Sequence, residues 1–98
     1  EMKVEKTIEN GKMTVKVAGK VDTSTAPEFE RELAVEGVRE IAFDLSAVEY
    51  VSSAGLRAFL NARKALGDGG RMTVAGANES VRRIFTLTGF GRIMEFEG

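Results

Sequence analysis

Two runs of alternating apolar and polar side chains open the chain and predict two β-strands. The apolar positions are Met2, Val4 and Ile8 in the first run and Met13, Val15 and Val17 in the second. Between the runs lies Asn10-Gly11, a pair that favours the tight turn of a β-hairpin, and Gly19 closes the second run. We therefore expect these two strands to pair antiparallel.

Residues 22–37 carry the signals of a helix. Residues 22–25 (Asp-Thr-Ser-Thr) are candidate N-caps, and Pro27 suits a first helical turn. The apolar stripe comprises Phe29, Leu33 and Ala34. Gly37 marks the place where we expect this helix to end.

The middle of the chain changes from strand to helix character. Residues 38–48 alternate again and predict a third strand. One side of this strand carries Ile41, Phe43 and Leu45, and the other side carries Ala42 and Ala47, which are small enough to be covered. From about Ser53 the apolar spacing becomes helical, at Leu56, Phe59, Leu60 and Leu66. The Gly-Asp-Gly-Gly run at 67–70 predicts the turn that ends this second helix.

The last third of the chain completes the predicted fold. Residues 72–75 form a short strand, Asn78 caps a helix, Gly89 is its C-cap, and residues 92–96 form a last strand. The apolar positions of this third helix are Val81, Ile84, Phe85 and Leu87. The order β-β-α-β-α-β-α-β predicts a single α/β domain over residues 1–98. We expect a mostly parallel sheet, an antiparallel N-terminal hairpin strand, and helices packed on the sheet.

Composition and charge narrow the classes of function. Lys and Arg number 14 against 15 acidic residues, so no strong positive field attracts nucleic acid. The chain has one Tyr and no Trp to stack on bases, and we expect no nucleic-acid partner. The chain has no Cys and no His, which removes disulfides, thiolate metal sites and the usual general base of hydrolases. No apolar run approaches the roughly 18 residues of a membrane span, and no signal-peptide pattern opens the chain. We expect a cytoplasmic protein without metal or cofactor.

Two adjacent serines, Ser52 and Ser53, lie where the strand pattern changes to the helix pattern. Serine is among the commonest N-cap residues, so helix capping is one interpretation of this pair. Helix capping is also one interpretation of Asp22. The other interpretation is a hydroxyl displayed at a turn, where a kinase can reach it. Leu56 follows within the first helical turn, as a core residue or as an anchor in a partner's groove.

Three separated stretches resemble the signatures of STAS domains, and specifically of bacterial anti-sigma-factor antagonists. Residues 44–56 (DLSAVEYVSSAGL) are similar to the family's central motif. Residues 19–22 (GKVD) resemble its G-x-[LIV]-D element, and residues 81–89 (VRRIFTLTG) resemble its V-x-R-[IL]-F-x-x-[ST]-G helix. The order of elements agrees over essentially the whole length.

The resemblance implies a function. An antagonist of this family binds an anti-sigma factor, itself a protein serine kinase, and so releases a sigma factor. The kinase then phosphorylates a serine at the start of the second helix, the pair separates, and a PP2C-type phosphatase resets the cycle. By register the acceptor is Ser53. Ser52 is the second choice, because it stands where the family usually has Asp. The implied partner-binding residues are Asp22, Thr23, Ser52, Ser53, Ala54, Gly55 and Leu56.

Physical chemistry supports a switch at this junction. A helix N-terminus favours an anion, so a phosphate on Ser53 would leave its own helix intact. The modification adds about −1.5 to −2 charges, which a docked partner would have to desolvate. Gly55 lacks a Cβ and would let a partner's backbone approach closely.

Two alternatives remain at the level of the sequence. The chain could be a STAS protein-interaction module of another assembly, such as a lipid-transport or stress-signalling complex, without a phosphorylation cycle. It could also be an enzyme with Ser53 as nucleophile, although His is absent and the nearest Lys along the helix is Lys64. The oligomeric state, the cognate sigma factor, kinase and phosphatase, and the presence of a further C-terminal helix are left open.

Overall fold

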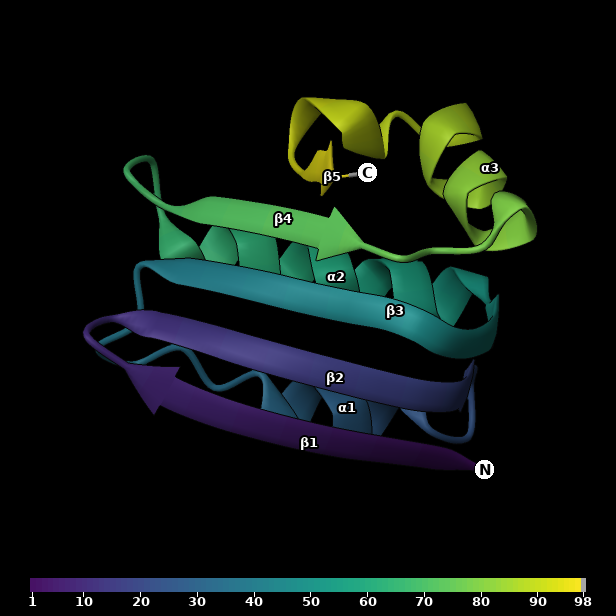
Figure 1. Ribbon diagram of the computed structural model, residues 1–98, viewed down its shortest axis with the longest axis horizontal. Coiled ribbons are helices and arrows are strands. Elements are labelled where there is room, and N and C mark those ends of the chain that lie inside the picture. Colours follow the sequence, from purple (N-terminus) through teal and green to yellow (C-terminus); the bar gives the residue numbers. More distant parts are fainter. Residues whose placement is uncertain (98) are drawn as a thin grey trace.

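The computed structural model describes residues 1–97 and shows one five-stranded sheet with helices. The elements are β1 (Met2–Glu9), β2 (Lys12–Val21), α1 (Ala26–Glu32), β3 (Glu40–Val51), α2 (Ser53–Leu66), β4 (Arg71–Ala75), α3 (Glu79–Leu87), a 3₁₀ helix η1 (Phe90–Arg92) and β5 (Glu95–Glu97). The strands lie side by side in the order β1-β2-β3-β4-β5 (Figure 1). β1 is antiparallel to β2 and every other neighbouring pair is parallel, which confirms the predicted α/β fold.

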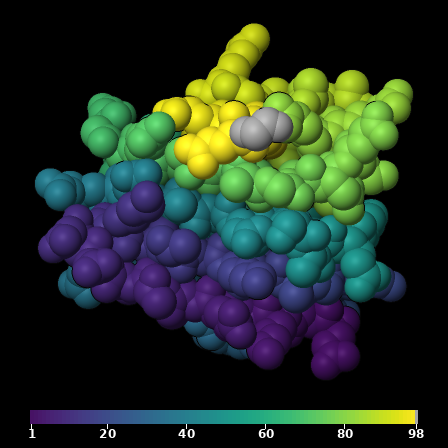
Figure 2. All heavy atoms as spheres, viewed as in Figure 1, coloured from purple at the N-terminus to yellow at the C-terminus, as the bar shows by residue number. Residues whose placement is uncertain are grey.

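The helices α1 and α2 lie together against one face of the sheet (Figure 1). In β2, Met13, Val15 and Val17 are fully buried, whereas Lys12 and Lys16 between them are exposed. Figure 2 gives the same view with all heavy atoms. Residues from both the N-terminal and the C-terminal half of the chain form the face seen there, which is opposite the face covered by α1 and α2. The two-residue period of a strand thus separates a core face from a polar face.

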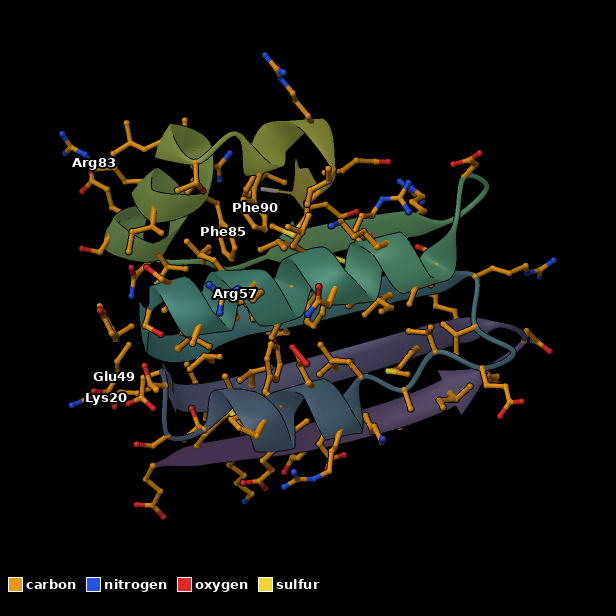
Figure 3. The ribbon with its side chains drawn as sticks, turned by 180° about the vertical axis from the view of Figure 1, so that it is seen from behind. Lys20, Glu49, Arg57, Arg83, Phe85 and Phe90 are labelled. Atoms are coloured by element: carbon orange, nitrogen blue, oxygen red, sulfur yellow. The ribbon has the colours of Figure 1, made fainter. Side chains whose placement is uncertain are left out.

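An aromatic cluster joins the helices to the sheet. The ring centroid of Phe59 in α2 lies 5.0 Å from Phe29 in α1, 4.9 Å from Phe43 in β3 and 5.2 Å from Phe85 in α3. Phe85 in turn packs at 5.4 Å from Phe90 in η1, and both are labelled in Figure 3. Edge-to-face pairs at these distances add stabilisation beyond the buried area, so the cluster holds α2 against α1, β3 and α3.

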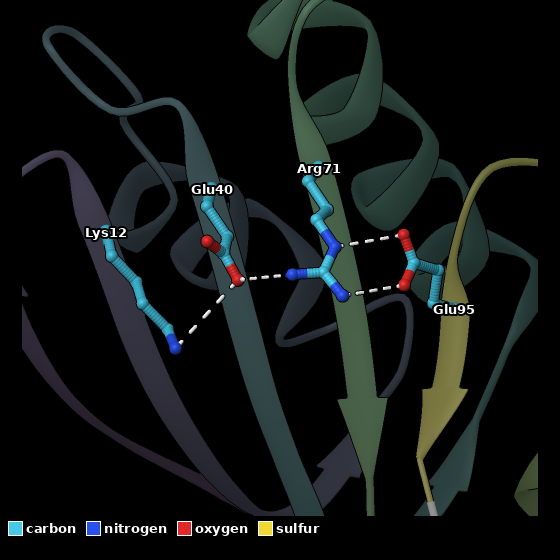
Figure 4. Close-up of polar contacts among 4 residues, drawn as sticks. All are labelled: Lys12, Glu40, Arg71 and Glu95. Atoms are coloured by element: carbon cyan, nitrogen blue, oxygen red, sulfur yellow. Dashed lines mark hydrogen bonds and ion pairs between the residues drawn. The ribbon is translucent and has the colours of Figure 1, made fainter.

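An ion-pair row crosses the polar face at the amino ends of the parallel strands (Figure 4). Glu40 Oε2 lies 3.8 Å from Lys12 Nζ and 3.5 Å from Arg71 Nη1. Arg71 also donates two hydrogen bonds to Glu95, at 3.0 and 2.8 Å, which holds the short strand β5 to β4. These bonds keep the pKa of the Glu95 carboxyl below its usual value and raise the pKa of Arg71.

The first predicted helix is too long. α1 ends at Glu32, because Leu33 donates its N–H back to Glu30 O and a turn follows, closed by a bond from Val38 N to Val35 O of 2.8 Å. Leu33 and Val38 are both buried. The turn brings both side chains into the core, and this burial outweighs the helical preference of the segment.

The third strand runs to Val51 rather than to residue 48. Register shifts in the β2–β3 ladder change the buried positions from every second residue to every third, at Leu45, Val48 and Val51. A search for alternation cannot follow that change. The prediction that Ala47 is covered is also wrong, since Ala47 is exposed, while Ala42 is half-buried.

The segment predicted as one last strand contains a 3₁₀ turn. Ile93 and Met94 both donate their N–H groups to Phe90 O at 3.0 Å, and β5 begins only at Glu95. Phe90 is 8% exposed, so burying its ring selects this turn. Leu87, predicted to belong to the apolar stripe of α3, is 77% exposed and lies outside the core.

Candidate functional site

The two stretches predicted to bind a partner meet at the carboxyl ends of β2 and β3. Val21 and Val51 form the last residue pair of this parallel ladder, so Asp22 and Ser52 follow directly at the same edge of the sheet. The N–H of Ser52 donates to Val21 O at 2.9 Å and joins the two turns. The edge lies at the right of Figure 1, where α2 starts. Segments about 30 positions apart in the sequence thus form one surface.

The adjacent serines have different roles. Ser52 is half-buried and is the N-cap of α2, because its backbone is extended (φ −90°, ψ 178°) and its Oγ accepts a hydrogen bond from Gly55 N at 3.3 Å. Ser53 is the first helical residue and is exposed. Within residues 1–97 no hydrogen bond engages the Ser53 hydroxyl. The capping interpretation is therefore confirmed for Ser52, and Ser53 is the serine with the exposed hydroxyl.

Asp22 organises the turn before α1. Its Oδ1 accepts hydrogen bonds from the N–H groups of Ser24 and Thr25, at 3.0 and 3.1 Å. These bonds, chiefly that from Thr25, keep the pKa of the Asp22 carboxyl below its usual value. The Thr25 hydroxyl turns back to Lys20 O at 2.8 Å rather than capping the helix. Thr23 is exposed beside this rigid turn.

Gly55 has an internal role. It is buried, and a Cβ placed on it would lie 2.5 Å from Val21 O and 3.0 Å from Val51 Cγ1. The close approach that we expected for a partner's backbone is made instead by the protein's own strand β2. Leu56 is half-buried and packs against the core, and Ala54 is half-buried.

The central motif also contains a local pair of hydrogen bonds between Asp44 and Ser46, away from Ser53. Asp44 Oδ1 accepts hydrogen bonds from the N–H and hydroxyl of Ser46, at 3.0 and 2.7 Å, which lowers the pKa of Asp44. A Cβ on Gly76, after β4, would lie 2.9 Å from Ser46 Cβ. These motif residues lie where β3 and the turn after β4 approach each other, away from Ser53.

The predicted partner-binding residues leave out part of the surface around Ser53. Tyr50 is 48% exposed and pairs with Lys20 across the β2–β3 ladder. Lys20 and Glu49 lie together at this end of the molecule in Figure 3. Arg57 is exposed one helical turn after Ser53. With the third strand predicted to end at residue 48, Glu49 and Tyr50 had no place in the sheet, although an aromatic residue before the serine pair was a usable signal.

No cluster of three or more acidic side chains could hold a metal ion within residues 1–97. No described helix has both the length and the apolar character to cross a bilayer. The geometry offers a rigid, partly apolar surface around the exposed hydroxyl of Ser53, which suits docking of another protein.

Comparison with known proteins agrees with this architecture. The STAS domain family model matches residues 3–97. An anti-sigma-B factor antagonist of Staphylococcus aureus is 32% identical over 97 residues, which cover 95% of this chain and 90% of that protein. The crystal structure of an anti-sigma factor antagonist from Mycobacterium paratuberculosis superposes with a TM-score of 0.86 at 26% identity, covering 98% of this chain and 85% of the other. The anti-sigma factor antagonist SpoIIAA in its unphosphorylated form shares the fold, with a TM-score of 0.77 at 14% identity over 100% of this chain and 88% of the other.

Proposed function

The chain belongs to the STAS domain family, and from that premise we propose that it is an anti-sigma-factor antagonist that acts by binding and not by catalysis. In its unmodified form it docks onto an anti-sigma factor and so releases a sigma factor. The anti-sigma factor is also the kinase that ends the interaction by phosphorylating Ser53. The observation that carries the proposal is the exposed, unengaged hydroxyl of Ser53 beside the capping hydroxyl of Ser52.

The docking surface we propose is the carboxyl edge of the sheet. Thr23 and Ser53 are exposed there, on turns that Asp22 and Ser52 hold rigid. Tyr50 adds an aromatic side chain of the kind enriched in protein interfaces. A preformed surface of this kind loses little conformational entropy on binding.

The covalent step is phosphoryl transfer from MgATP. The Oγ of Ser53 attacks the γ-phosphorus and forms the new O–P bond. The bond from that phosphorus to the β,γ-bridging oxygen breaks, ADP leaves, and the hydroxyl proton passes to the catalytic base of the kinase. A PP2C-type phosphatase hydrolyses the ester and resets the cycle. Because the cycle needs ATP and a sigma factor, it requires a cytoplasmic location.

The phosphate would preserve the fold and prevent docking. Ser53 takes no part in the cap, and a helix N-terminus stabilises a nearby anion by about 0.3–1 kcal/mol at an exposed site. A partner covering Ser53 would have to desolvate a dianion, which costs several kcal/mol without a counter-charge. SpoIIAA, which shares this fold, is known in both an unphosphorylated and a phosphorylated form. For that protein the fold accommodates the phosphate.

Ser52 in place of the family's usual Asp does not weaken the proposal. Serine and aspartate are about equally good N-caps, and the Ser52 hydroxyl makes the capping bond to Gly55 N. The alternative interpretation, a STAS module of a lipid-transport or other assembly, drew on this difference. Co-purification from the native cell discriminates the two, because the proposal requires an ATP-binding serine kinase as the partner.

A phosphorylation assay tests the proposal directly. The protein is incubated with the anti-sigma-factor kinase encoded nearest to it and with MgATP, and the product is mapped by mass spectrometry. We expect one phosphate on Ser53 in the wild type and in Ser52→Ala, and none in Ser53→Ala. Full labelling of Ser53→Ala, or none of the wild type, would overturn the assignment.

A further inference from the structure

Arg57 lies one helical turn after Ser53 on α2. Both side chains are exposed, and residues four apart on a helix have Cβ atoms about 5–6 Å from one another. Helical side chains lean toward the N-terminus of their helix, so we expect the Arg57 guanidinium to lie near the turn that contains Ser53. Figure 3 labels Arg57 on α2, in the half of the helix nearer its start.

Arg57 has no ionic partner among residues 1–97. The ion pairs of the described chain involve other cations, namely Lys3, Lys6, Lys12 and Arg71. The first turn of α2 contains no acidic residue, so the position four residues before Arg57, where a carboxylate would pair with it, is occupied by Ser53. A phosphate on Ser53 would supply the missing anion.

We propose that Arg57 is the intramolecular counter-ion of phosphorylated Ser53. This inference rests on the proposed function, because it concerns the modified state of the same site. Arginine donates several N–H groups in a planar fork that matches phosphate oxygens, and an anion N-terminal to a cation at this spacing is the favourable orientation on a helix. Arg57 is thus a positioning residue for the phosphate.

The pairing distinguishes the two serines a second time. The residue four positions after Ser52 is Leu56, which offers no charge, and phosphorylation of Ser52 would also consume the hydroxyl that caps α2. Other charged groups at this edge include Asp22, Lys20, Glu49 and the N-terminal residue Glu1, whose carbonyl oxygen accepts a hydrogen bond from Lys20 N. Arg57 is the cation that stands one helical turn from Ser53 on the same helix.

The pairing gives the switch two effects. In the unmodified protein the Arg57 guanidinium is available to a carboxylate on the partner. After phosphorylation it is drawn to the phosphate, so one modification adds a dianion to the docking surface and withdraws a cation from it.

The test measures the second pKa of the phosphate by ³¹P NMR. Phosphoserine is installed at position 53 during translation, without any kinase, in the wild-type background and in Arg57→Gln and Lys64→Gln. Lys64 is also exposed on α2 but lies eleven residues from Ser53, about 16 Å along the helix, beyond the Debye length at physiological salt. Circular dichroism confirms that each variant is folded.

We expect the phosphate pKa to be about 0.2–0.4 lower in the wild-type background than in Arg57→Gln. Lys64→Gln should match the wild type, Arg57→Lys should keep most of the difference, and 1 M NaCl should reduce it. Equal pKa values in wild type and Arg57→Gln, or an equal rise in Lys64→Gln, would overturn the inference. Because no kinase or partner takes part, this result is separate from the proposed function, which fails if the phosphorylated protein still binds its anti-sigma factor.

Discussion

Replacing Ser52 and Ser53 separately by alanine should have opposite consequences. Ser52→Ala removes the bond from the Ser52 hydroxyl to Gly55 N, and loss of an N-cap costs about 0.5–2 kcal/mol. At 3.3 Å this bond is long, so we expect a value in the lower half of that range, about 0.5–1 kcal/mol. For a domain of this size such a loss lowers Tm by roughly 2–8 °C. Ser53→Ala removes no bond and should stay within about 0.5 kcal/mol of the wild type.

Urea unfolding followed by circular dichroism measures both free energies of unfolding. Ser52→Asp is the matched control, because aspartate caps a helix as well as serine and should leave stability within a few tenths of a kcal/mol. The kinase assay should give the reverse ranking, with Ser52→Ala still phosphorylated and Ser53→Ala inert. The division of roles is refuted if Ser53→Ala loses as much stability as Ser52→Ala, or if Ser52→Ala is as stable as the wild type.

Two further changes test the turns that support the site. Gly55→Ala should destabilise the protein by about 1–3 kcal/mol in urea unfolding, despite better helix propensity, because its Cβ would lie 2.5 Å from the backbone oxygen of Val21; an unchanged midpoint would contradict this. Asp22→Asn keeps an oxygen acceptor but cannot ionise. In the wild type the pKa of Asp22 is lower in the folded than in the unfolded state, so ionised Asp22 contributes stability above about pH 4. That contribution is lost as the pH falls through the folded-state pKa. The variant should therefore lose less stability than the wild type on acidification below pH 4, and parallel pH profiles would count against the hydrogen bonds to Asp22.

The element order and the sheet could be predicted because local signals agreed with the final packing. The Asn10-Gly11 turn, with Asn10 at φ 53° and Gly11 at φ 79°, forms the expected hairpin, and the Asn78 side chain caps α3 by accepting a bond from Val81 N. Each of these signals depends only on residues within a few positions of one another. The sequence of the segment is therefore enough to predict the turn and the helix cap.

The errors occur where side-chain packing and strand pairing decide local structure. Val51 belongs to β3 because the ladder with β2 shifts its register, and the 3₁₀ turn at Phe90 forms because the ring packs against Phe85. Leu87 fits a helical stripe by spacing, yet α3 turns it outward. The β2 partner of Val51 is Val21, thirty positions earlier in the chain, and neither this pairing nor the packing of Phe90 on Phe85 follows from periodicity.

The candidate site shows the same division between local and distant causes. The strand-to-helix junction at Ser52 and Ser53 could be located from the sequence, but which hydroxyl is the cap depends on the position of Gly55 N. The role of Gly55 could not be predicted at all, because it depends on Val21, more than thirty positions earlier.

The most direct test compares binding of two forms of the same protein to the anti-sigma factor by calorimetry. One form is unmodified and the other carries phosphoserine at position 53, with folding of both checked by circular dichroism. The account predicts superimposable spectra and an affinity at least about 100-fold weaker for the phosphorylated form, since an uncompensated dianion at the interface costs several kcal/mol. Equal affinities of the two folded forms would contradict it.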